Sequence, residues 1–187
     1  MRVSLSALLS AFGVCLVAPA CALADQNDPR LDGLFAALRA PQGSAADAVA
    51  TQARIEEIWF VPPETGIGIL FDRAVMALNA REPALALDLV SHVNGLAPSY
   101  AEGWVLAGHA HSAAGDSGAA ARAYAEAVRL EPRHFTALTR LGDLAVEAGD
   151  KRGGLRRYRE ALLLNPHLDA VRARADGLRD EIGSREI

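Results

Sequence analysis

Residues 101–132, AEGWVLAGHAHSAAGDSGAAARAYAEAVRLEP, and residues 135–166, FTALTRLGDLAVEAGDKRGGLRRYREALLLNP, carry one pattern twice, at an offset of 34 positions. The matching positions hold side chains of the same kind: Trp104, Gly108, Gly115, Asp116, Ala120, Tyr124, Ala127 and Pro132 correspond to Leu138, Gly142, Gly149, Asp150, Gly154, Tyr158, Ala161 and Pro166. A repeat of about this length indicates a stack of similar two-helix units.

The residue types within one copy explain how such a unit would form. Trp104 and Gly108 lie four residues apart and share a helix face, so the second helix can approach closely beside the glycine. Gly115 can adopt a left-handed conformation after the first helix, and Asp116 can cap the second one. Pro132 comes just after Leu130, where it prevents further helix growth. We therefore predict a helix-turn-helix over each copy.

In these positions the chain resembles the tetratricopeptide repeat family. The resemblance implies an all-α fold, a right-handed superhelical solenoid of helix-turn-helix units. It also implies a function, since arrays of this kind present a concave surface to another protein or peptide and rarely catalyse reactions. We accordingly expect a protein-binding scaffold or adaptor and not an enzyme.

Weaker copies of the pattern extend the array in both directions. Residues 101–134 and 135–168 are predicted as full repeats and residues 66–98 as a degenerate one, in which Arg81-Glu82-Pro83 replaces the glycine-aspartate turn. Proline is well tolerated in the first turn of a helix, so this turn can still work. Residues 169–187 are predicted as a capping helix and tail with a polar outer face.

Residues 25–65 are predicted as an N-terminal helix pair followed by a proline-rich loop. Asp28-Pro29 is typical of a helix start. The second helix should run towards Trp59-Phe60, with Val49, Ile55, Ile58 and Trp59 on its apolar side. This pair has the length of a repeat but not its residue pattern, and an eroded repeat and an N-terminal cap are both open interpretations.

Residues 1–24 have the composition of a secretory signal peptide: Arg2, a short apolar run, and then small residues. Cleavage near Ala24 would place the mature chain in the periplasm or outside the cell of a bacterium, with no stable membrane insertion. The alternative is a lipoprotein anchored at Cys21. Cleavage would also remove Cys15 and Cys21, the two cysteines of the sequence.

Composition and spacing give no support to a catalytic, cofactor or metal site. His109 and His111 lie two apart on a predicted helix, so their side chains diverge by roughly 200 degrees and cannot share a metal ion. His134 and His167 each follow a repeat-ending proline and are interpreted as loop residues. The net charge of −4 argues against nucleic acid as a partner. We expect no cofactor.

The resemblance also implies which residues face a partner, because the first helix of each unit lines the concave surface. The predicted groove residues are Phe71, Val75, Leu78 and Asn79, then Glu102, Val105, His109, Ser112 and Ala113, and finally Thr136, Thr139, Asp143, Val146 and Glu147. The positions that bind a C-terminal carboxylate elsewhere in the family hold Phe71, Val75, Leu106 and Thr136 here, with only Arg140 basic, so that ligand is not expected.

The predicted groove has an apolar end and a mildly acidic end. Phe71, Val75 and Val105 form the first, and Asp143 and Glu147 the second. This pattern predicts a partner segment with apolar side chains and a basic residue. Two alternatives stay open: self-association into a homodimer through Trp59, Phe60 and the front helices, and the role of an auxiliary subunit in an envelope enzyme complex.

Overall fold

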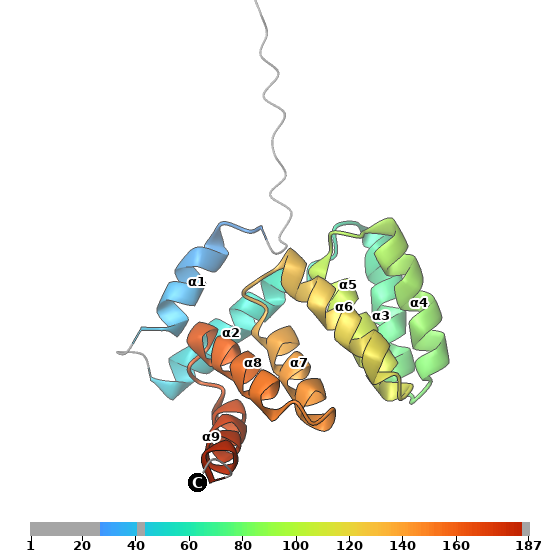
Figure 1. Ribbon diagram of the computed structural model, residues 1–187. Coiled ribbons are helices and arrows are strands. Elements are labelled where there is room, and N and C mark those ends of the chain that lie inside the picture. Colours follow the sequence, from blue (N-terminus) through green and yellow to red (C-terminus); the bar gives the residue numbers. More distant parts are fainter. Residues whose placement is uncertain (1–26, 41–43, 185–187) are drawn as a thin grey trace, which may run out of the picture.

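The computed structural model describes residues 27–40 and 44–184, and these residues form helices joined by short turns and loops (Figure 1). The predicted leader, with Cys21 and Ala24, lies outside the described residues. The helices are α1 (Arg30–Leu38), α2 (Ala45–Trp59), α3 (Thr65–Asn79), α4 (Pro83–Leu96), α5 (Ala101–Ala113), α6 (Ser117–Leu130), α7 (Phe135–Glu147), α8 (Lys151–Leu164) and α9 (Asp169–Ser184). None of these helices is long and apolar enough to cross a membrane.

Helices α3 to α8 pair as α3–α4, α5–α6 and α7–α8 and stack in that order, which confirms the predicted all-α solenoid. Gly115 and Gly149 adopt positive φ angles of 81° and 86° between paired helices. Asp116 and Asp150 cap the second helices by accepting hydrogen bonds from the backbone N–H of Ala119 and Gly153, at 2.8 and 2.7 Å.

The turn of the first repeat reaches the same geometry with a different residue. Arg81 takes the left-handed conformation, with φ of 60°, and the N–H of Glu82 donates to the carbonyl of Ala77 at 2.9 Å. The corresponding bond in the second repeat runs from Asp116 to His111, also at 2.9 Å. Arginine therefore stands where the other repeats have glycine, and the proline that follows begins α4. The sequence had indicated only the contribution of the proline.

A ring opposite a glycine sets the distance between paired helices. A Cβ atom added to Gly108 would lie 2.4 Å from Cε1 of Tyr124, and one added to Gly142 would lie 2.5 Å from Cε1 of Tyr158. Both distances are far below van der Waals contact, so each glycine allows its tyrosine ring to fit. The first repeat has Ala74 and Val90 at these positions, where the smaller side chain of valine leaves room for a methyl group.

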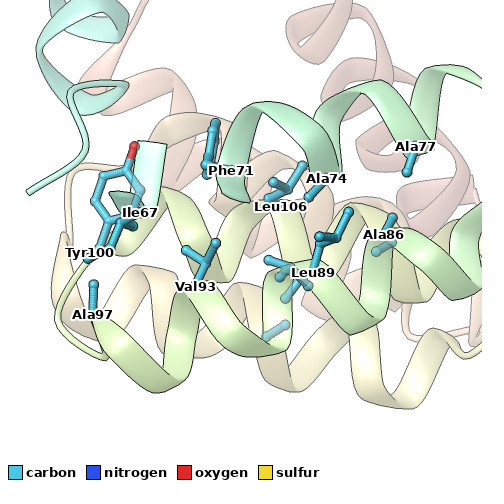
Figure 2. Close-up of a cluster of buried hydrophobic side chains, with 14 residues drawn as sticks. Ile67, Phe71, Ala74, Ala77, Ala86, Leu89, Val93, Ala97, Tyr100 and Leu106 are labelled. Carbon is cyan, nitrogen blue, oxygen red and sulfur yellow. The ribbon is translucent and has the colours of Figure 1, made fainter. Parts of the chain in front are cut away.

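The core of the first repeat is built from small and branched side chains (Figure 2). Ala74 and Ala77 on α3 and Ala86 on α4 are almost completely buried and let the two helices pack closely. Phe71 packs edge-on to Tyr100, at 5.7 Å between ring centres. The core therefore continues from α3 and α4 to the start of α5.

The front helix pair does not stack on α3 but docks against the second and third repeats. Figure 1 shows α1 and α2 on the side of α7 and α8, away from α4. Leu31, Phe35, Leu38, Ile55, Ile58 and Trp59 form one cluster with Phe135, Leu138 and Ala161. The front pair is therefore not stacked in line with the repeats, as an eroded repeat would be. It also does not cover the exposed end of the first repeat, as an N-terminal cap would. Val49, expected on the apolar side of α2, is 70% exposed.

The segments that follow the repeat-ending prolines form the docking site for this pair. Arg133 donates to Asp32 at 2.7 Å and lies over the ring of Phe35, 5.1 Å from its centre. Asn165 donates from Nδ2 to Gln52 at 2.8 Å, and Nε2 of His167 lies 3.1 Å from the carbonyl of Leu38. His134 and His167 lie in loops between helices, as predicted, but the sequence did not indicate that these loops hold polar contacts to the front pair.

Helix α9 covers the other end of the stack. Val171, Ala175 and Leu178 are buried against Leu155 and Tyr158 of α8. The opposite side of α9 is exposed and carries charged residues, including the ion-paired Asp176 and Arg179. This arrangement is the one expected of a terminal helix in a repeat protein.

Replacing Gly108 by alanine tests the spacing rule. We expect Gly108→Ala to lower the free energy of unfolding by about 1–3 kcal/mol, because the new methyl group collides with Tyr124. Gly177→Ala is the matched control, because Gly177 lies within α9 and no atom is close to the added Cβ. Alanine at this position should raise the free energy of unfolding by up to about 1 kcal/mol. Urea unfolding of both variants measures the difference, and equal effects would contradict the rule.

Replacing Trp59 by alanine tests the docking of the front pair. The side chain is 2% exposed, and its loss should reduce the free energy of unfolding by about 3–5 kcal/mol. Its neighbour Phe60 is 51% exposed, so Phe60→Ala should cost no more than about 0.5 kcal/mol. Chemical denaturation followed by circular dichroism gives both values. Similar losses for the two variants would show that the front pair is not held by Trp59.

Candidate partner-binding groove

An open cavity of about 440 Å³ lies between α2, α3, α5 and the start of α7. We call it the apolar groove. Its lining residues are Glu56, Trp59, Phe60, Phe71, Val75, Leu78, Asn79, Glu102, Val105, Leu106, His109, His134 and Thr136. The size is within the range of sites that bind a small molecule or a few side chains of a peptide.

Helices α3 and α5 form one wall of the apolar groove. Phe71, Val75 and Leu78 recur three or four residues apart on α3, so they face the same direction. Val105 and His109 do the same on α5. Phe71 and Val105 are also part of the core, and this fixes the position of the wall.

The opposite wall comes from α2, which the sequence did not predict. Glu56, Trp59 and Phe60 lie in the last turn and C-terminal cap of α2 and complete the groove. Phe60 faces Phe71 edge-on, with 6.1 Å between ring centres. A paired Trp-Phe at a helix end, followed by two prolines, is the local signal in this region, but it does not say where α2 docks.

A buried hydrogen-bonded pair lies at the base of the groove. Nδ1 of His134 accepts from the backbone N–H of Ala137 at 3.3 Å, so Nε2 is the ring atom that donates to Glu102, at 2.8 Å. The indole of Trp59 stacks on this imidazole, with 4.3 Å between centres and 16° between planes. The histidine thus joins α2, α5 and α7 through one ring. His134 lies in the loop before α7, as predicted, but this packing role was not predicted.

Glu56 is the second carboxylate of the groove, and it makes no ion pair with the described residues. It is half-buried, and one oxygen accepts from Nε2 of Gln52 at 2.9 Å. Burial beside apolar side chains makes an uncompensated negative charge costly, so a cation supplied by a partner would be favourable there. The apolar groove therefore combines an apolar surface with one carboxylate that can accept a basic group.

A second cavity of about 630 Å³ continues the concave face towards α9. We call it the polar pocket. Ser112, Tyr124, Arg140, Asp143, Glu147, Tyr158 and Arg174 are among its lining residues, and His109 borders both cavities. Its walls are formed by the C-terminal halves of α5 and α7 and by the sides of α6 and α8 that carry Tyr124 and Tyr158. Arg174 of α9 completes them.

Asp143 does not give this end of the groove a free negative charge. Its carboxylate accepts from Tyr158 at 2.7 Å, lies 3.5 Å from Arg140, and pairs with Arg174. The predicted role of Asp143 as a binding group for a partner's basic residue is therefore not supported by the geometry, because two arginines already neutralise it. Glu147 is exposed and makes no ion pair with the rest of the described chain.

Burial shifts the pKa values of the ring side chains around the polar pocket. It lowers the pKa of His109, and the positive charge of Arg140 acts in the same direction. Nδ1 of this histidine lies 3.0 Å from the hydroxyl of Tyr124, whose pKa is raised by burial. Burial and the carboxylate of Asp143 raise the pKa of Tyr158 to about 12. All three groups are therefore uncharged at neutral pH.

The structure brings most of the predicted groove residues together on one surface. Phe71, Val75, Leu78, Asn79, Glu102, Val105, His109 and Thr136 line the apolar groove, and His109, Ser112, Asp143, Val146 and Glu147 line the polar pocket. Thr139 lines neither cavity; its hydroxyl donates to the carbonyl of Phe135 at 2.8 Å. Ala113 also lines neither. The lining residues that the predicted groove set lacks are Glu56, Trp59, Phe60, Leu106 and His134 in the apolar groove, and Ser117, Tyr124, Arg140, Leu144, Tyr158 and Arg174 in the polar pocket.

The described residues contain no cluster of three or more His, Cys, Asp or Glu side chains that could hold a metal ion. In the apolar groove Glu102 and His134 bond to each other, and neither Glu56 nor His109 joins them in a ligand set. What the arrangement can do chemically is to bind: it surrounds apolar side chains and offers one carboxylate beside them.

Comparison with solved structures finds proteins with a similar fold. The tetratricopeptide domain of Sgt2 from Aspergillus fumigatus is similar, with a TM-score of 0.61 and 22% identity over 66% of this chain and 83% of that one. MamA is similar with a TM-score of 0.61 and 16% identity, covering 86% of each chain. A double mutant of MamA RS-1 gives a TM-score of 0.51 and 20% identity over 71% and 74%.

No protein-family model matches the sequence, and no curated protein matches it. The identities to the solved structures are low enough that the likeness concerns the fold alone. The chain has the fold of a tetratricopeptide array, as the repeat pattern predicted.

The lowered pKa of His109 predicts how stability depends on pH. Between the ordinary histidine pKa of about 6.5 and the lower folded value, the unfolded chain binds a proton that the folded chain does not, so the free energy of unfolding falls as the pH drops. His109→Gln removes this contribution. We expect the wild type to lose more stability than the variant between pH 7 and pH 5, measured by urea unfolding at each pH. Parallel profiles would contradict it.

Proposed function

We propose that this protein is a non-enzymatic scaffold or adaptor that binds an apolar segment of a partner protein in the apolar groove. The observation that carries the proposal is the wall made by Trp59 and Phe60, which turns the open concave face of the repeats into a groove with apolar surfaces on two sides. A groove of this form fits a helix or an extended strand with large apolar side chains.

The charges of the groove favour a basic residue in the partner segment. Glu56 has no cation beside it, whereas Asp143 already has two. A lysine or arginine next to the apolar side chains would pair with Glu56 in a partly dry environment, where a charged hydrogen bond is stronger than in water. The basic residue predicted from the sequence is retained, but its binding site moves from α7 to α2.

We further propose that the protein acts in the bacterial cell envelope, in the periplasm or outside the cell, and that its partner is a component of an envelope complex. The support is the composition of residues 1–24, which is typical of a secretory signal. Attachment through Cys21 is the alternative. An auxiliary role beside an envelope enzyme would use the same groove.

Photocrosslinking in living cells tests the groove. A photoreactive residue placed at Asn79, which is exposed at the rim of the groove, should form a crosslink to one partner protein. The same residue placed at Leu163, which is 73% exposed on α8, serves as the control. A crosslink from both positions, or from Leu163 alone, would place the binding surface elsewhere.

Substitutions in the groove then test which of its side chains contribute to affinity. The partner segment identified by crosslinking is titrated into each variant. Phe60→Glu should weaken binding at least about 10-fold by placing a charge on the apolar wall, and Glu56→Gln should weaken it about 3- to 30-fold by removing the carboxylate. Leu163→Glu and Glu147→Gln should leave affinity unchanged. Tryptophan fluorescence gives the affinities in a Trp104→Phe background, where Trp59 is the remaining tryptophan.

A further inference from the structure

Helix α8 carries three arginines and a leucine in one exposed row. Arg152, Arg156, Arg159 and Leu163 follow one another at intervals of four, three and four residues, so they point to the same side of the helix, and all four are exposed. The opposite side, which holds Ala161, is buried. We call these four residues the arginine row.

The repeat architecture does not require these charges. The equivalent positions are exposed in every repeat but hold other residue types: Gly118, Arg122, Ala125 and Arg129 on α6, and Ala84, Asp88, Ser91 and Gly95 on α4. Helix α4 has one acidic residue, α6 has two basic and one acidic, and α8 has five basic and one acidic, so the formal charge rises from −1 to +1 to +4. The chain as a whole has a net charge of −4, and α8 therefore concentrates positive charge against the average of the molecule.

Carboxylates of the chain leave two guanidinium groups of the arginine row open to other anions. Arg156 approaches Asp150 only to 4.0 Å, and the carboxylate of Asp150 already caps α8. Arg159 makes no ion pair within the described part of the chain. Arg157 pairs with Glu160 beside the row, at 2.8 Å, so that carboxylate is also in use.

We propose that the arginine row binds the surface of a membrane that contains anionic phospholipids, with α8 lying parallel to that surface. A guanidinium group can donate two parallel hydrogen bonds to one phosphate, and every cation of the row is an arginine. Leu163, which is 73% exposed at the C-terminal end of the row, enters the boundary between headgroups and acyl chains. The row is about 16 Å long at 1.5 Å per residue, so it can contact several headgroups at once.

The shape of this surface favours a membrane over an acidic segment of a protein. No residue of the arginine row lines the apolar groove or the polar pocket, and a row along the outer side of a helix offers a peptide no walls. A lipid surface presents many phosphates in one plane and needs no cavity. It also accommodates Leu163, which an acidic segment would leave beside charge. Since α8 contributes nothing to the apolar groove, both surfaces can be occupied together.

The association should be reversible and sensitive to salt. One basic residue near an anionic surface contributes a factor of about five in affinity, so the three arginines together contribute a factor of about 100. Raising the salt concentration from about 0.05 M to about 0.5 M should weaken binding at least about 10-fold, because ions screen exposed charges.

Cosedimentation with vesicles tests the arginine row, using the full chain as processed by the cells that make it. Vesicles of phosphatidylcholine with about 40% phosphatidylglycerol should bind the wild type at least about 10-fold more tightly than vesicles of phosphatidylcholine alone. Attachment through Cys21 would add the same contribution to both affinities, so their ratio reports the protein surface.

Substitutions then locate the effect on α8. The triple variant Arg152→Gln/Arg156→Gln/Arg159→Gln should bind the phosphatidylglycerol vesicles at least about 30-fold more weakly than the wild type. Leu163→Gln should bind them about threefold more weakly, because it removes the apolar contact. Circular dichroism checks that every variant folds.

The matched control removes the same charge from exposed positions outside α8. Arg39→Gln/Arg54→Gln/Arg73→Gln should change the affinity by less than about twofold, because these arginines lie in the front pair and the first repeat. Equal affinity of the wild type for the two kinds of vesicle overturns the proposal. Equal losses in the two triple variants overturn it as well, since net charge and not the row would then cause the binding.

Discussion

The stacking of Trp59 on His134, with Glu102 bound to the other side of the imidazole, is the contact on which the shape of this protein depends. It joins the front helix pair to two repeats at once, because His134 begins α7 while Glu102 belongs to α5. A buried histidine and a buried carboxylate are costly to leave unpaired, so the pair fixes one arrangement of the three helices. The position of α2 follows from it, and α2 is the second wall of the apolar groove.

The spacing of the repeats is set by a different constraint, the contact of a ring with a glycine. Tyr124 and Tyr158 occupy the space that a Cβ atom would need at Gly108 and Gly142. The same tyrosines carry their hydroxyl groups to the concave side, where they reach His109 and Asp143. One residue type therefore determines both how closely the helices pack and which polar groups are available in the polar pocket. In the polar pocket Asp143 is bonded to Tyr158 and paired with Arg140 and Arg174, whereas Glu147 makes no ion pair with the described residues.

Helix α3 has two roles, on two of its sides. Its buried side holds the core of the first repeat and a second side lines the apolar groove, while Ile69 and Met76 lie exposed on the outer side. Because the front pair packs elsewhere, α3 is free on that outer side. The docking of α1 and α2 thus has two consequences: it builds the groove at one place and leaves an apolar helix face uncovered at another.

The sequence by itself determined the repeat and much of the groove. Side chains such as Tyr124 opposite Gly108, and capping residues such as Asp116, act within one repeat, so a single 34-residue pattern specifies helices, turns and the residues that face inward. Only the tertiary structure decided where α1 and α2 lie, that Trp59 is buried while Val49 is not, and that Asp143 is already neutralised by Arg174. These features depend on contacts between segments distant in the sequence. Helical periodicity shows that a face is apolar, but it does not show which surface covers that face.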